Sequence, residues 1–196
     1  MGDDILTTEK ILVTAEEVLR RYGPAKATVL DVARALGVSH GSVYRHFPSK
    51  AALRDAVTKR WLDRIMVPLT PIMEETGPAP ERLKRWLQTL AKYKHSKVLD
   101  DPELFATYSV LTEEAREVVK EHVAHLAEQV TKIIADGVAN GEFEATNPAA
   151  TAQTVLYATV RFHSPVHAQE WSEPGQEEAF ENVWNLILCG LNVRKS

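Results

Sequence analysis

Residues 39–47, SHGSVYRHF, carry a dense set of hydrogen-bonding side chains between a glycine turn and a proline. The pattern around them is typical of a short helix, yet this helix would contain Gly41. A glycine inside a helix costs about 1 kcal/mol relative to alanine, and a packed core gives no reason to accept that cost. A surface pressed against another molecule does give one, because the missing side chain lets the backbone come close.

The polar groups of this helix suit the base edges and phosphates of a DNA major groove. Backbone N–H groups at a helix N-terminus also favour phosphate, and the neighbouring helices offer such ends at Thr28 and at Ser49-Lys50. The candidate DNA-binding residues are Thr28, Ser39, His40, Gly41, Ser42, Tyr44, Arg45, His46 and Lys50. The alternative is a solvated polar helix that joins two core helices, because helix-turn-helix shapes also occur in proteins that never touch DNA.

The elements that would position these residues follow from helical periodicity, since strand signals are nearly absent. Start and stop signals fall at Thr7 or Thr8, Gly23-Pro24, Thr28, Gly37, Ser39 and Pro48-Ser49. Thr28 and Asp31 have the spacing of a capping box, and Ser39 is a good N-cap. Residues 7–60 are therefore predicted as helix, helix, tight turn, helix, helix, which is a helix-turn-helix arrangement.

The rest of the chain predicts longer helices, so the fold class is all-α. Pro68 and Pro71 bend or end the fourth helix, and 76–80 is a clear break. Further helices are predicted over 80–97, 101–110, 112–140, 147–167 and 176–192. The predicted domains are residues 1–60, a three-helix helix-turn-helix domain, and 61–196, a larger helical domain.

The stretch TVLDVARALGVSHGSVYRHFPSKAALRDAV, residues 28–57, resembles the DNA-binding signature of the TetR family of bacterial transcriptional regulators. The matching positions are the Gly37-Val38-Ser39 turn, Gly41, Val43-Tyr44, Phe47, Ser49-Lys50 and Leu53. The resemblance covers about the first 60 residues. It implies a homodimer, an operator with two-fold symmetry, release from DNA by a small-molecule effector, and an effector-binding and dimerisation role for 61–196. A repressor is favoured, and an activator stays open.

Two positions depart from the family's pattern. The chain begins Met-Gly-Asp-Asp, which is acidic where many relatives carry a basic arm, so no minor-groove contact is expected from it. His40 stands where relatives often have Lys or another polar residue, so the operator sequence does not carry over from a relative.

The resemblance places an effector pocket within 61–170, and its lining is sought among aromatic residues and two histidines. The candidates are Trp86, Tyr93, Phe105, Tyr108, Tyr157, Phe162, His163 and His167. For any one of the aromatics, a plain core position is the alternative. His163 and His167 share a helical face and could hold a metal, but Pro165 lies between them and only Glu170 is close in sequence as a third ligand, so no metal site is predicted. His122 and His125 are expected to be solvated.

The last two predicted helices, 147–167 and 176–192, are expected to form the homodimer interface as a four-helix bundle. One apolar stripe comprises Val155, Leu156, Thr159 and Phe162, and the other comprises Phe180, Val183, Trp184, Ile187, Leu188 and Leu191. The alternative is that both stripes face the core of their own subunit.

Composition and charge limit the remaining classes. The net charge is −4, but residues 1–60 hold ten Lys/Arg against seven Asp/Glu, so the basic excess lies with the candidate DNA-binding helix. No apolar run approaches a membrane span, and the acidic start Met-Gly-Asp-Asp is not expected to be a secretory signal. The lone Cys189, expected to be buried, fits a reducing cytoplasm. No cofactor and no enzymatic activity are expected. The rival hypotheses are a helical enzyme using the histidine pairs or Glu113-Glu114, and an adaptor that binds only protein.

Overall fold

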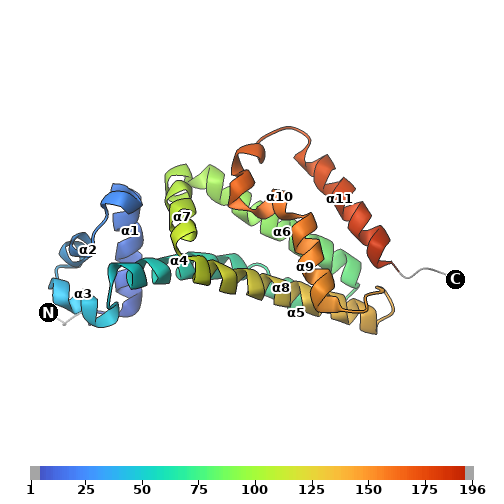
Figure 1. The fold of residues 1–196 in the computed structure, drawn as a ribbon, viewed down its shortest axis with the longest axis horizontal. Helices are drawn as coiled ribbons and strands as arrows, with labels where there is room; N and C mark the ends of the chain where they lie inside the picture. Colours follow the sequence, from blue (N-terminus) through green and yellow to red (C-terminus); the bar gives the residue numbers. More distant parts are fainter. Residues whose placement is uncertain (1–4, 193–196) are drawn as a thin grey trace. The chain divides into compact units, whose positions relative to one another are not determined.

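The computed structural model describes residues 5–192, which form helices joined by short connections (Figure 1). Only one isolated antiparallel bridge, between Phe143 and Asn192, interrupts the helical character of this range. The all-α fold class is therefore confirmed. Within the same residues, no helix is both long enough and apolar enough to cross a membrane.

The chain divides into two compact units, residues 1–62 with 101–120, and residues 63–100 with 121–196. The predicted domain boundary at residue 60 stays a prediction. Residues 101–120, which the sequence analysis assigned to the second domain, cluster with the first unit in the structure.

The first unit contains four consecutive helices and one helix from later in the chain. They are α1 (Thr8–Lys26), α2 (Val29–Leu36), α3 (His40–His46), the greater part of α4 (Lys50–Met66), and α7 (Pro102–Glu114). The predicted signals are confirmed: Thr7 caps α1, Thr28 and Asp31 form a capping box on α2, and Ser39 caps α3. Gly37 ends α2 in the left-handed region, with φ 66°, where glycine is favoured.

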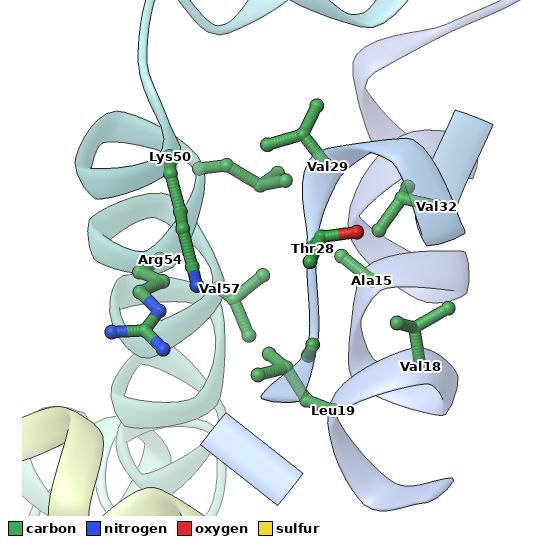
Figure 2. A pocket seen from close by; sticks show the side chains of 11 residues that line it. Ala15, Val18, Leu19, Thr28, Val29, Val32, Lys50, Arg54 and Val57 are labelled. Carbon is green, nitrogen blue, oxygen red and sulfur yellow. The ribbon is translucent and has the colours of Figure 1, made fainter. Parts of the chain in front are cut away.

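The core of the first unit forms where α1, α2 and α4 meet (Figure 2). Ala15, Val18 and Leu19 of α1 pack here with Val32 of α2 and Val57 of α4, all of them buried. The gap left between these side chains is only about 20 Å³, which is room for one water molecule at most. This part of the chain is therefore a close-packed support for α3 and not a ligand cavity.

The second unit contains the end of α4, α5 (Thr70–Glu74), α6 (Ala79–Asp100), most of α8 (Arg116–Ala139), α9 (Pro148–Ala158), α10 (Val160–His163), the 3₁₀ helix η1 (Pro165–Glu170) and α11 (Gln176–Leu191). Its core includes Leu83, Trp86, Leu90 and Ile133, each essentially inaccessible to solvent. The N-cap at Asn147 is confirmed, since its Oδ1 accepts from the N–H of Ala150 at 3.1 Å.

The single helix predicted over 147–167 is wrong. The chain leaves helical geometry at Thr159, whose hydroxyl donates to the carbonyl of Val155 at 2.9 Å, and again at Ser164. Ser164 precedes Pro165, and a residue before proline is driven toward extended backbone; its ψ of 129° follows that rule. The predicted helix 112–140 is likewise interrupted at Ala115, where α7 ends and α8 follows.

Candidate DNA-binding surface and effector region

The candidate recognition helix α3 buries its apolar residues and leaves its polar residues accessible. Val43 and Phe47 are buried, whereas His40, Gly41, Arg45 and His46 are exposed. Ser42 and Tyr44 are half-buried, and Thr28, Ser39 and Lys50 are exposed. All nine predicted DNA-binding residues are thus at least partly open to solvent.

The side chains of α3 are ordered by contacts among themselves. The Ser39 hydroxyl lies 2.8 Å from that of Ser42, and Arg45 Nη2 donates to Ser42 Oγ at 3.1 Å. The His40 and Tyr44 rings meet edge to face at 4.6 Å. These contacts set the direction of the hydrogen-bonding groups before any partner binds, which reduces the entropy lost on binding.

Neither the backbone conformation nor the neighbouring atoms of the described chain require a glycine at position 41. Its backbone is helical and carries no positive φ. A Cβ built there would meet only Ser39 Oγ, at 3.9 Å, which is ordinary van der Waals contact. Within the described chain an alanine fits at this position and would favour the helix, so the space above Gly41 is free for something outside the chain.

Two further helix starts flank α3. Ser49 Oγ accepts from the N–H of Ala52 at 3.0 Å and thereby caps α4, with the exposed Lys50 beside it. Thr28 differs, because its hydroxyl and its N–H both bond to Asp31 Oδ2, at 2.6 and 3.1 Å. These hydrogen bonds lower the pKa of Asp31, so a negative charge stands next to Thr28 and opposes a phosphate there.

Helix α7 is attached to α1 and α4 by three contacts within the first unit. Arg20 Nη2 lies 2.6 Å from Asp101 Oδ2, and Arg54 Nη1 lies 2.6 Å from Glu114 Oε2. The Trp61 and Tyr108 rings stack at 4.3 Å with an interplanar angle of 8°. Arg54 also donates to the carbonyl of Pro24 near the end of α1. Sequence reasoning missed this attachment, because no local sequence pattern indicates contacts between residues so far apart in the chain.

The predicted effector residues do not gather in one place. Trp86 is fully buried, and its indole N–H donates to Gln129 Oε1 at 2.8 Å, which is a core position. Tyr157 is 74% exposed. Tyr108 is buried and Phe105 half-buried, both in the first unit.

The remaining candidates lie in the second unit. Tyr93 is half-buried on α6, and Phe162 and His163 are buried on α10. His167 is half-buried in η1, where its Nδ1 lies 2.9 Å from Glu170 Oε1. Within residues 5–192, no group of three or more His, Cys, Asp or Glu side chains is placed to hold a metal ion.

An open cavity of about 510 Å³ lies in the second unit, bordered by α6, α10, α11 and the segment between η1 and α11. Its wall includes His95, Phe162, Trp171, Gln176 and Phe180. Only Phe162 was among the predicted effector residues. His95 is fixed there by stacking on Trp171 at 4.3 Å and by its Nε2, which lies 2.8 Å from the carbonyl oxygen of Phe162. A volume of this size is typical of small-molecule sites.

The first apolar stripe assigned to the dimer faces its own chain, and the second does so in part. Val155, Leu156, Thr159 and Phe162 are buried, and so are Phe180, Trp184 and Leu191. The other members of the second stripe, Val183, Ile187 and Leu188, are half-buried. The apolar residues that these helices expose are different ones: Tyr157, Val160 and Leu186. Of the predicted stripe residues, only the half-buried ones of α11 are open to a second copy of the chain.

Two smaller expectations are wrong. Cys189 is exposed, because it lies on the outward side of α11. His122 is buried instead of solvated, while His125 is exposed as expected. The expectation about the acidic N-terminal residues 1–4 lies outside the described residues.

Two family models together match most of the chain. Residues 11–57 match the model of bacterial regulatory proteins of the tetR family, and residues 79–184 match the tetracyclin repressor-like C-terminal domain. The chain is 30% identical over 83 residues to the nucleoid occlusion factor SlmA of Vibrio atlanticus, covering 42% of each protein. It is 33% identical over 108 residues to the uncharacterized HTH-type transcriptional regulator Rv1255c of Mycobacterium tuberculosis, covering 53% of this chain and 50% of that one. The chain thus spans about half or less of these curated relatives.

The fold is also similar to solved structures. One is the transcriptional regulator FadR from Bacillus subtilis in complex with stearoyl-CoA, with a TM-score of 0.66 and 18% identity, covering 94% of this chain and 99% of that one. At this identity the similarity establishes the fold alone.

Proposed function

This chain belongs to the TetR family of bacterial transcriptional regulators, and we propose from that premise that it is a ligand-released repressor. It binds a palindromic operator as a homodimer, and a small-molecule effector detaches it. Its site of action is the cytoplasm, and it catalyses no reaction.

The observation that carries this proposal is the exposed face of α3. Six polar side chains of residues 39–46 lie around a glycine that the rest of the chain does not require. A helix that presents its N-terminal half to the major groove needs both features, because base edges are read by hydrogen bonds and the backbone must come near them. A solvated surface helix needs neither.

The dimer rests on the exposed residues Tyr157, Val160, Leu186 and Cys189 of α9, α10 and α11. To bind one operator, such a dimer must present its two copies of α3 to successive major grooves, which lie about 34–36 Å apart on one side of DNA.

Release requires that effector binding changes the position of α3. The three contacts that attach α7 to α1 and α4 provide the route, since α6 ends at Asp100 and α7 begins two residues later. A ligand that favours a different path for α6 or α7 would displace α4, and with it Lys50 and the end of α3. The ligand shifts this equilibrium only by the difference between its affinities for the two states. FadR with stearoyl-CoA supports the view that this fold accommodates an effector.

The experiment is selection of bound sequences from random duplex DNA, followed by gel shifts over a range of salt concentrations. A sequence with two-fold symmetry is expected. The logarithm of affinity should fall with the logarithm of salt concentration by about 0.9 for each phosphate contact. An adaptor that binds only protein would enrich no sequence, and a flat salt response would contradict the proposal.

A further inference from the structure

Lys94 of α6 is an unusual residue for the interior of a small helical unit. It is 8% exposed, whereas lysine is among the residues least often buried without a partner. Within residues 5–192 the structure records no carboxylate in an ion pair with Lys94, and no hydrogen bond from its ammonium group. Burial alone lowers the pKa of Lys94 to about 8, so the group still carries its charge at neutral pH.

The ionisable group that faces Lys94 from the packed element is His163 of α10, and it cannot neutralise Lys94. His163 is 9% exposed, and burial together with the nearby Lys94 ammonium lowers its pKa to about 3. The ring is therefore neutral at pH 7. Its Nε2 lies 3.3 Å from the Thr159 hydroxyl, which itself donates to a backbone carbonyl, so the ring is held in place beside α6.

Other cations stand near the same side of α6. Lys97 Nζ lies 5.1 Å from the centre of the Tyr93 ring, and Arg64 at the end of α4 interacts electrostatically with the Tyr93 hydroxyl. Tyr93 itself is half-buried. The region thus combines an aromatic ring, a buried cation and further positive charge, although the second unit as a whole is rich in acidic residues.

This arrangement differs from the cavity on the neighbouring side of α6. There His95 and Phe162 form the wall, one residue away from Lys94 and His163 respectively. Consecutive helical residues point about 100° apart, and neither Lys94 nor His163 lines that cavity. A desolvated cation with no internal partner is unfavourable, and an anion that arrives with a ligand relieves the cost.

We propose that Lys94, with His163 beside it, anchors the effector by binding its carboxylate, so that the effector is an organic carboxylic acid. This inference rests on the proposed function, because it names the class of compound that would release the protein from DNA. The charge comes from Lys94, and Tyr93 offers an aromatic surface to the body of the ligand.

The test uses hexanoate, decanoate and benzoate, each beside its primary amide, with the full-length wild type. Calorimetry and thermal shift should give at least about tenfold tighter binding for one or more of the acids than for the matching amide, because a charge-assisted hydrogen bond is lost in the amide. Lys94→Met should bring the ratio of acid to amide affinity close to one, and Lys94→Arg should restore part of it. Lys92→Met, which removes an exposed lysine from the same helix, should leave the ratio unchanged.

A second measurement needs no ligand. The Tm of Lys94→Met should equal or exceed that of the wild type, since methionine removes a buried charge and keeps the volume. A Tm lower by more than about 5 °C would mean that the ammonium stabilises the fold through an internal partner, and it would overturn the proposal. Equal binding of every acid and its amide by the wild type would overturn it as well.

Gel shifts on the same preparations separate this inference from the proposed function. Operator binding without a preference for carboxylates would refute only the anchor at Lys94. Carboxylate binding that depends on Lys94, in a protein that selects no DNA, would uphold the anchor and refute the regulator.

Discussion

The two units of this protein differ in where their candidate binding groups lie relative to solvent. On α3 the hydrogen-bonding side chains are exposed, so water satisfies them while no partner is bound. On α6 the residue Lys94 is buried and has no acid beside it within the described residues. A solvated group costs the unbound protein little free energy, and it adds affinity mainly through complementary charge on the partner. A buried charge destabilises the unbound protein until an opposite charge binds beside it.

The two sites should therefore respond differently to salt and to the loss of a side chain. At the proposed DNA-binding surface, the affinity for DNA should depend on salt. The loss of one side chain there should have little effect on the stability of the fold. The region around Lys94 should behave in the reverse manner. Four changes test this contrast, and their expected effects on operator affinity decrease from the first to the last.

The largest effect is expected from Leu186→Glu on α11. Leu186 is 76% exposed in the single chain, so the variant should fold but fail to dimerise. Operator affinity should fall by on the order of 100-fold, because the second half-site would no longer be bound from the same molecule. Analytical ultracentrifugation and anisotropy on operator DNA measure both. Leu99→Glu, at an equally exposed leucine of α6, is the control and should remain a dimer.

Lys50→Met at the start of α4 should weaken binding to all DNA sequences alike. The reason is the loss of a phosphate contact, which should reduce the salt slope by about 0.9 for each subunit. Lys120→Met, which removes an exposed lysine from α8, should leave the slope as it is. A change in sequence preference caused by Lys50→Met would show that this side chain reads bases.

Gly41→Ala should move stability and DNA binding in opposite directions. The helix should gain about 0.5–1 kcal/mol of unfolding free energy, since no atom of the chain obstructs the new methyl group. Operator affinity should decrease several-fold, because the backbone can no longer come as close to the groove. Urea unfolding and gel shifts on one preparation compare the two effects. Unchanged affinity would mean that close approach to DNA does not explain the glycine.

The last change, with the smallest expected effect on operator affinity, concerns pH and Lys94. A lysine whose pKa is lowered to about 8 in the folded state, against an ordinary value of 10.5, binds fewer protons when folded than when unfolded between those values. The free energy of unfolding contributed by Lys94 therefore rises with pH in that window. Urea unfolding should show the wild type approaching Lys94→Met in stability as the pH increases from about 8 to 10.5, and a constant difference would contradict the burial of the charge.

Much of the first unit was predictable because its signals are local. Thr28, Ser39 and Gly37 act on backbone groups within three or four residues of themselves, and the spacing alone determines those hydrogen bonds. The nine predicted DNA-binding residues are all accessible, although their contact with DNA stays a prediction.

The second unit was less predictable because its features depend on residues far apart in the chain. The burial of Lys94 follows from the position of α10, about 70 residues later, and the orientation of α9 and α11 decides whether Tyr157 or Val155 faces outward. The break near Ser164 does have a local signal, because Pro165 restricts the residue before it. The apolar periodicity of 147–167 favours a continuous helix instead, and the prediction gave that periodicity more weight.

A hydroxyl-radical footprint of the protein on its selected operator decides whether two copies of α3 bind one duplex. Two protected patches on one face of the duplex are predicted, with centres about 10–10.5 base pairs or a multiple of that apart, as two symmetry-related copies of α3 require. A single patch without symmetry, or no protection of any duplex at low salt, would contradict this mode of binding.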